Sequence, residues 1–163
     1  METKLPDQVD RPVAHRSLGK LISFIGRSIH WVVAHDLEHI GLGSGTYNFL
    51  RIVHTNPGIT QNELSEFSQV DKATVAKGLA KLESQGYLAR VRDTRDRRVR
   101  RLRLTDAGES IIPTVYETLR HVTEICTADL NDQEVETLFS LLDRVEEALT
   151  AHINAAKGEV AAE

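Results

Sequence analysis

The chain of 163 residues is poor in aromatic side chains, which make up 5% of it, and it has one cysteine and one tryptophan. A single cysteine, Cys126, excludes a disulfide within the chain and is typical of a reducing cytoplasm. The most apolar stretch, residues 18–33, is interrupted by two basic residues and a histidine, so it is too short and too charged to span a membrane. The first 17 residues lack an apolar segment, and we expect no secretory signal there.

The composition is that of an ordinary globular domain, with 40% hydrophobic and 27% charged residues. This length gives room for about one domain with an adequate core. Few runs of β-branched residues occur outside residues 87–104. We therefore predict a mostly α-helical fold with a small β-wing.

Helical periodicity dominates the first half of the chain. From Leu18 to Val33 the apolar residues recur every three or four positions, which predicts an amphipathic helix of about twenty residues. Residues 41–45 are rich in glycine and end this pattern. A second helix contains Tyr47 and stops at residues 56–58.

Two short helices follow in close succession. Residues 60–63 have the T-x-x-E form of a capping box, so a helix should begin at Thr60, with Leu64 and Phe67 as its core contacts. The next helix is expected to begin after Asp71 and to end at residues 85–86. Its apolar residues face inward, and Lys72, Ala73, Thr74, Lys77, Gly78 and Lys81 remain on or near the outer face. This arrangement is typical of a helix-turn-helix, whose second helix enters the major groove of DNA.

A strongly basic hairpin comes next. Residues 87–92 and 97–104 are predicted to form two strands around a turn at residues 93–96. Residues 90–103 contain eight arginines and two aspartates, a balance of +6, so a net charge of -4 leaves -10 on the rest of the chain. Such asymmetry indicates a polyanionic partner, because extended arginines can straddle a phosphate backbone or enter a minor groove. The alternative, a merely solvated charged face, is weaker directly behind a helix-turn-helix.

The last helix carries a narrow apolar seam. Asn131 is expected to cap it, with Glu134 as partner in a capping box, and residues 155–163 are expected to fray. Three long amphipathic helices need a surface to cover, and a two-fold dimer provides it while setting two recognition helices about 34–36 Å apart. We predict a helical dimerisation region at residues 14–42 and 106–154, around a DNA-binding domain at residues 44–105. The predicted interface contains Leu18, Leu21 and Ile25 from the first helix and Val135, Leu138, Leu142, Val145 and Leu149 from the last.

Several motifs together resemble the MarR family of transcriptional regulators. They are Gly41-Leu42 with Tyr47, Gly58-Ile59-Thr60-Gln61-x-Glu63-Leu64, Val70-Asp71-Lys72-x-Thr74-Val75, Leu82-Glu83-x-x-Gly86-Tyr87-Leu88-x-Arg90, Asp96-Arg97-Arg98 and Leu104-Thr105-x-x-Gly108. The resemblance covers about residues 15–150, and its ending, DRR to LTxxG, is the most specific part. It implies a homodimeric winged helix-turn-helix protein that binds a pseudo-palindromic operator, usually as a repressor released by a small aromatic or phenolic ligand.

The resemblance also implies roles for individual residues. Arg98 would enter the minor groove while Asp96 braces the wing, and Thr74 and Lys77 would face the major groove. We expect phosphate contacts from Lys72, Arg95, Arg97 and Arg100. Gly78 departs from the larger residue common at its position, and since glycine inside a helix costs about 1 kcal/mol relative to alanine, we expect either a close backbone approach or simple drift.

The ligand pocket of such regulators lies between the dimer helices and the winged helix. Trp31, His35 and Tyr47 are candidates to line it, although Trp31 suits a protein core equally well. No cofactor or bound metal is expected.

Other functions find less support in the sequence. His35 and His39 lie one helical turn apart and could hold zinc, but polar histidines at a dimer interface fit better. Cys126 could be a redox switch, yet its apolar surroundings favour a buried, inert thiol. No nucleophile motif or phosphate-binding glycine loop indicates an enzyme. A winged helix that binds protein would have a neutral or acidic wing.

Overall fold

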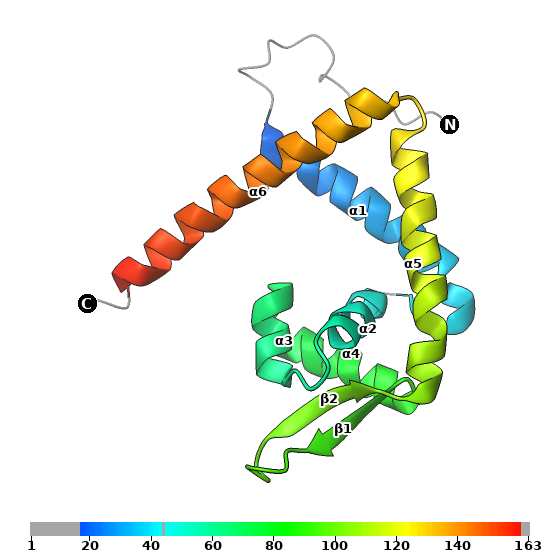
Figure 1. Cartoon of the computed structure of the whole chain (residues 1–163), viewed down its shortest axis with the longest axis vertical. Coiled ribbons are helices and arrows are strands. Elements are labelled where there is room, and N and C mark those ends of the chain that lie inside the picture. Colours follow the sequence, from blue (N-terminus) through cyan, green and yellow to red (C-terminus); the bar gives the residue numbers. More distant parts are fainter. Residues whose placement is uncertain (1–16, 44, 161–163) are drawn as a thin grey trace. The chain divides into compact units, whose positions relative to one another are not determined.

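The computed structural model describes residues 17–43 and 45–160. In chain order its elements are α1 (Leu18–Asp36), the 3-10 turn η2 (Glu38–Ile40), α2 (Thr46–Thr55), α3 (Gln61–Ser68), α4 (Lys72–Ser84), β1 (Leu88–Arg92), β2 (Arg100–Leu104), α5 (Asp106–Thr127) and α6 (Asp132–Val160). The mostly helical fold with a small β-wing is confirmed (Figure 1). The chain divides into two compact units, the first ending at Val122 and the second beginning at Thr123.

Side-chain caps fix three helix starts where the sequence predicts them. The Thr60 hydroxyl accepts a hydrogen bond from the Glu63 N–H at 3.2 Å, and the Glu63 carboxylate accepts one from the Thr60 N–H at 2.7 Å. The Asp71 carboxylate accepts the Thr74 N–H at 2.9 Å. The same reciprocal pair joins Asn131 and Glu134, at 3.1 and 2.9 Å. These caps satisfy N–H groups that a helix leaves unpaired at its start, so they define where each helix begins.

The core of the first unit lies inside the helix-turn-helix. Leu50 of α2, Leu64 of α3 and Leu79 of α4 are all fully buried. The prediction that Phe67 joins them is wrong, because its side chain is 64% exposed. The inner face of the short helix α3 continues from Leu64 through Ser65, which is buried and donates to the Val70 carbonyl at 2.6 Å.

The wing is a two-stranded antiparallel hairpin. Its register pairs Leu88 with Leu104 and Arg92 with Arg100, so the second strand is shorter than predicted and residues 93–99 form the tip. The outer edge of β2 is also paired, since the Leu102 N–H donates to the Ile59 carbonyl at 2.9 Å. The wing is therefore attached to the turn between α2 and α3 by backbone hydrogen bonds.

The end of α4 is tied to the turn that follows η2. The Gln85 side-chain amide donates to the Gly41 carbonyl at 2.9 Å, and the Tyr87 hydroxyl donates to the Ile40 carbonyl at 3.1 Å. Gly41 has a φ of 77°, a backbone conformation that L side chains rarely adopt, and a Cβ there would meet the Gln85 amide nitrogen. Only glycine fits this position without rearrangement. These contacts hold the C-terminal end of α4 in place.

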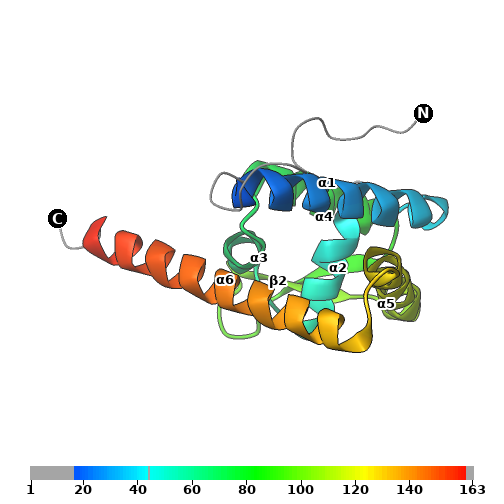
Figure 2. The same cartoon turned by 90° about the horizontal axis from the view of Figure 1, so that it is seen from above.

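In the second unit α6 is one continuous helix (Figure 2). The prediction that the chain frays from residue 155 is wrong for residues 155–160, because α6 extends to Val160. Residues 161–163 of the predicted tail, Ser44 and residues 14–16 lie outside the described residues. The division into a dimerisation region and a DNA-binding domain stays a prediction.

Candidate nucleic-acid interface

Helix α4 has one buried face and one polar face. Val75, Leu79 and Leu82 are fully buried, as predicted. Thr74 and Lys77 lie on the other face, and so does Lys81 one turn further on, whereas Lys72 is exposed as the first residue of the helix, on the side of Val75. The helix is thus anchored on one side and presents one hydroxyl and two ammonium groups on the other, with a third ammonium group at its N-terminal end.

Gly78 does not lie on this outer face. It is buried, and a Cβ at this position would lie 2.5 Å from Cε2 and 2.8 Å from Cδ2 of the Phe49 ring. The expected close approach is therefore present, but its partner is a side chain of α2. Glycine lets α2 and α4 approach closely beneath the polar face.

The arginines of the wing lie on both faces of the hairpin. Since directly opposed residues share a face and successive residues along a strand point to opposite faces, Arg90, Arg92 and Arg100 lie on the side of the buried Leu102. Arg101 lies on the opposite side. Of the arginines predicted to contact DNA, Arg95, Arg97 and Arg98 are in the tip, Arg100 begins β2, and all four are exposed.

Asp93 forms the ion pair that braces the wing, and the bracing role expected of Asp96 stays a prediction. Its carboxylate accepts the Arg101 Nε–H at 2.6 Å and the backbone N–H groups of Arg95 and Asp96 at 2.7 and 3.0 Å. These donors, the Arg101 guanidinium first, lower the pKa of Asp93 to about 2. The Asp96 carboxylate accepts the Arg98 N–H at 2.9 Å, and its backbone carbonyl accepts the Val99 N–H at 3.0 Å, both within the tip.

Arg101 carries this brace to the helix-turn-helix. Its guanidinium also donates to the Gly58 carbonyl at 3.0 Å, in the turn before α3. Neither Arg101 nor Asp93 is among the site residues that the sequence motifs predict. The hairpin register would have found them, because it places the two residues diagonally across the strands.

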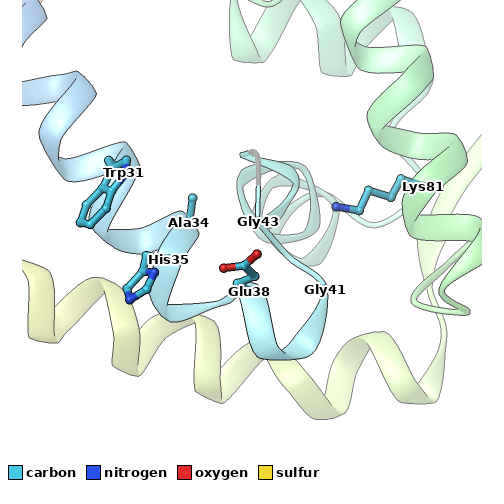
Figure 3. Close-up of a pocket in the computed structure, with 7 residues that line it drawn as sticks. All are labelled: Trp31, Ala34, His35, Glu38, Gly41, Gly43 and Lys81. Atoms are coloured by element: carbon cyan, nitrogen blue, oxygen red, sulfur yellow. The ribbon is translucent and has the colours of Figure 1, made fainter.

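Two cavities lie beside α4 in the first unit. One of about 340 Å³ is lined by Trp31 and His35 of α1 and by Lys81 of α4, which reaches in from the other side (Figure 3). The Trp31 and His35 rings are stacked, with centroids 5.3 Å apart and an interplanar angle of 6°. Trp31 is 67% exposed, so the core alternative for this residue is wrong.

The second cavity has a volume of about 580 Å³ and is lined by Tyr47, Phe49, Thr74, Lys77 and Lys81. Burial raises the pKa of the Tyr47 hydroxyl. The three residues predicted to share one ligand pocket thus lie in two neighbouring cavities, and Lys81 lines both.

The structure also describes the histidines considered as a zinc site and the cysteine considered as a redox switch. Among residues 17–43 and 45–160, no group of three or more histidine, cysteine or carboxylate side chains could hold a metal ion. His39 instead bonds to the Asp36 carbonyl at 2.8 Å. Cys126 is exposed in the single chain, so the prediction of a buried thiol is wrong there.

Two helices expose apolar side chains at the predicted dimer positions. Leu18, Leu21 and Ile25 of α1 are 53%, 39% and 43% exposed. Leu138, Leu142 and Leu149 of α6 are 38%, 42% and 56% exposed, while Val135 and Val145 are half-buried. None of the helices that the structure describes is long and apolar enough to cross a membrane.

A hairpin wing attached to a three-helix unit with an exposed polar helix defines a winged helix-turn-helix protein. Comparison with known proteins agrees: the profile of the MarR family matches residues 44–99. The chain is 30% identical over 113 residues to the uncharacterized HTH-type transcriptional regulator YybA of Bacillus subtilis (strain 168), covering 69% of this chain and 75% of that protein.

Solved structures agree as well. The crystal structure of a MarR protein superposes with a TM-score of 0.78 at 30% identity, covering 86% of this chain and 96% of that one. A putative MarR-family regulator from Listeria monocytogenes, crystallised with a 26-mer DNA, has a TM-score of 0.75 at 19% identity, covering 82% and 89% of the two chains, and shows the shared fold. The chain belongs to the MarR family of transcriptional regulators. This is a family of DNA-binding regulators and not of enzymes.

Proposed function

We propose that the protein is a homodimeric repressor that binds a pseudo-palindromic operator in duplex DNA and releases it when a small aromatic or phenolic ligand binds. One observation carries the proposal: the exposed polar face of α4 and the arginine-rich wing belong to one braced unit. Because its proposed partner is DNA, we expect the protein to act in the cytoplasm.

The two parts of this surface have different tasks. Thr74 and Lys77 read base edges in the major groove, since they project from the polar face in the N-terminal half of α4. Lys72 contacts the backbone and raises affinity for all sequences alike. At the wing, Arg98 enters the minor groove, while Arg95, Arg97 and Arg100 contact phosphates.

Dimerisation follows from the apolar side chains that one chain leaves uncovered. A second copy related by two-fold symmetry covers the stripes on α1 and α6 with the same stripes, since such an interface is self-complementary. It also presents two copies of α4 to successive turns of the major groove. A pseudo-palindromic operator is the matching sequence.

The two cavities beside α4 supply the room for an effector. Their volumes, about 340 and 580 Å³, are in the range of small-molecule sites. A ligand in the larger cavity contacts Thr74 and Lys77, the residues assigned to base readout. Occupancy there changes the surface that DNA needs.

Selection of bound sequences from a random-site DNA library tests the proposal. The wild-type protein should enrich a pseudo-palindrome, and Arg98→Ala should weaken binding to it about ten-fold or more in a gel-shift titration, since a lost charge-assisted hydrogen bond is worth roughly 1.5–3 kcal/mol. Thr74→Ala and Lys77→Ala should alter the selected sequence. Enrichment of no sequence by the wild type would sink the proposal.

A further inference from the structure

A third cavity lies where the wing meets the start of α3. It has a volume of about 360 Å³, and Arg90, Arg98 and Arg100 line it from the wing. From the other side come Gln61 and Asn62, the first two residues of α3. No acidic residue is among those that line it, so every ionic group at this described cavity is a guanidinium.

The hairpin register concentrates positive charge here. Arg100 stands directly opposite Arg92, and Arg90 is two residues before Arg92 on the same face. Like charges directly opposite each other destabilise a hairpin. Of the three, Arg90 has an ion pair within the protein, to Glu83 at 3.2 Å. Arg100, which lines the cavity, therefore has an unfavourable like-charge neighbour in Arg92, and an anion bound to Arg100 would offset that repulsion.

Arg101 of the wing differs from the arginines that line the cavity. Arg101, on the opposite face, is held by Asp93 and by the Gly58 carbonyl and does not line the cavity. Arg101 thus braces the wing, whereas Arg90, Arg98 and Arg100 line a cavity that has no acidic residue in its described lining. Proteins tend to break such local rules at functional or strained sites.

We propose that this cavity binds one phosphate group of the DNA backbone, held jointly by Arg90 and Arg100 and approached by the side-chain amides of Gln61 and Asn62. Planar guanidinium groups match phosphate oxygens in paired hydrogen bonds. Arg98 lines the same cavity and is assigned to the minor groove, whose walls are phosphates. One phosphate there joins the helix-turn-helix to the wing and fixes their common register on DNA.

This inference rests on the proposed DNA binding and adds to it Arg90, the two amides and the sharing of one phosphate. The test uses the full-length protein and its selected operator, with a neutral methylphosphonate placed at one backbone position at a time. Wild-type protein should lose about ten-fold or more in affinity at one position in each half-site. The double variant Arg90→Gln/Arg100→Gln should be insensitive to the same replacement, because its partners are gone.

The salt dependence gives a second readout. Each phosphate contributes about 0.9 to the slope of log K against log salt concentration. A shared phosphate predicts that the double variant loses about 0.9 per half-site, whereas two independent contacts predict a loss of about 1.8. Arg103→Gln removes one guanidinium charge from the opposite face of β2 and should retain the wild-type methylphosphonate pattern. Circular dichroism and melting curves check that each variant is folded.

Two results would overturn the inference while leaving DNA binding intact. One is a methylphosphonate scan in which the wild-type protein binds its operator but every backbone position that weakens its binding also weakens binding of the double variant. The other is micromolar binding of inorganic phosphate to the DNA-free protein that the double variant abolishes, which assigns the cavity to a free phosphate ligand. A wild-type protein that binds no DNA refutes the proposed function and the inference together.

Discussion

Gly78→Ala sets two opposing effects of known size against each other. Alanine inside a helix is favoured over glycine by about 1 kcal/mol. At this position, however, the new Cβ would lie 2.5 Å from the Phe49 ring, which is only 6% exposed and cannot swing into solvent. Overpacking of a core costs roughly 1–3 kcal/mol. We therefore expect a net change between about zero and 2 kcal/mol of destabilisation, the difference of these two terms.

A change at Phe49 reverses the sign. In a Phe49→Leu background the aromatic edge is gone, so Gly78→Ala should stabilise by about 1 kcal/mol, the helix-propensity difference alone. The coupling free energy of the double-mutant cycle is then about 1–3 kcal/mol. Gly26→Ala is the matched control, because a Cβ at that glycine of α1 meets nothing within 4 Å.

Urea unfolding at one fixed protein concentration measures these differences, since the stability of a dimer depends on concentration. Gly26→Ala should raise the unfolding midpoint. Gly78→Ala should raise it only in the Phe49→Leu protein, where the smaller side chain leaves room for the added methyl group. If Gly78→Ala raises the stability equally in both backgrounds, the close packing of α2 against α4 is refuted.

Two further predictions concern the dimer and the wing. Leu142→Asp should lower the melting temperature and shift the protein toward monomer or aggregate in sedimentation, because it places a charge on the apolar stripe of α6. The control variant Arg144→Ala, about 200° around the helix, should remain dimeric. A folded, dimeric Leu142→Asp protein would contradict the assigned interface. The pKa of Asp93 is lowered to about 2 from 3.8, so its contribution to stability is complete above pH 3.8 and is lost as the pH falls through about 2. Asp93→Asn should therefore be less stable than wild type at about pH 6 in urea unfolding, and the gap should close toward about pH 2; an equal gap at both pH values would exclude this ion pair as the cause.

The sequence by itself determined the features that depend on neighbouring residues. Capping of α3 by Thr60 and Glu63, and of α6 by Asn131 and Glu134, joins groups three residues apart, so sequence spacing specifies the geometry. The buried stripe of α4 follows in the same way from helical periodicity. The family resemblance also rests on such local motifs, and the family comparison confirmed it.

Only the tertiary structure decided the features that join distant parts of the chain. The brace passes from Asp93 through Arg101 to Gly58, over a span of 43 residues between the last two, whereas the local motif points only to Asp96. Gly78 was placed on the wrong face because its neighbour, the Phe49 ring, belongs to another helix. The grouping of Arg90 with Arg100 required the hairpin register, since a shift of one residue moves a side chain to the opposite face. Local patterns fix where helices begin and which faces are apolar, whereas packing and register decide which side chains meet.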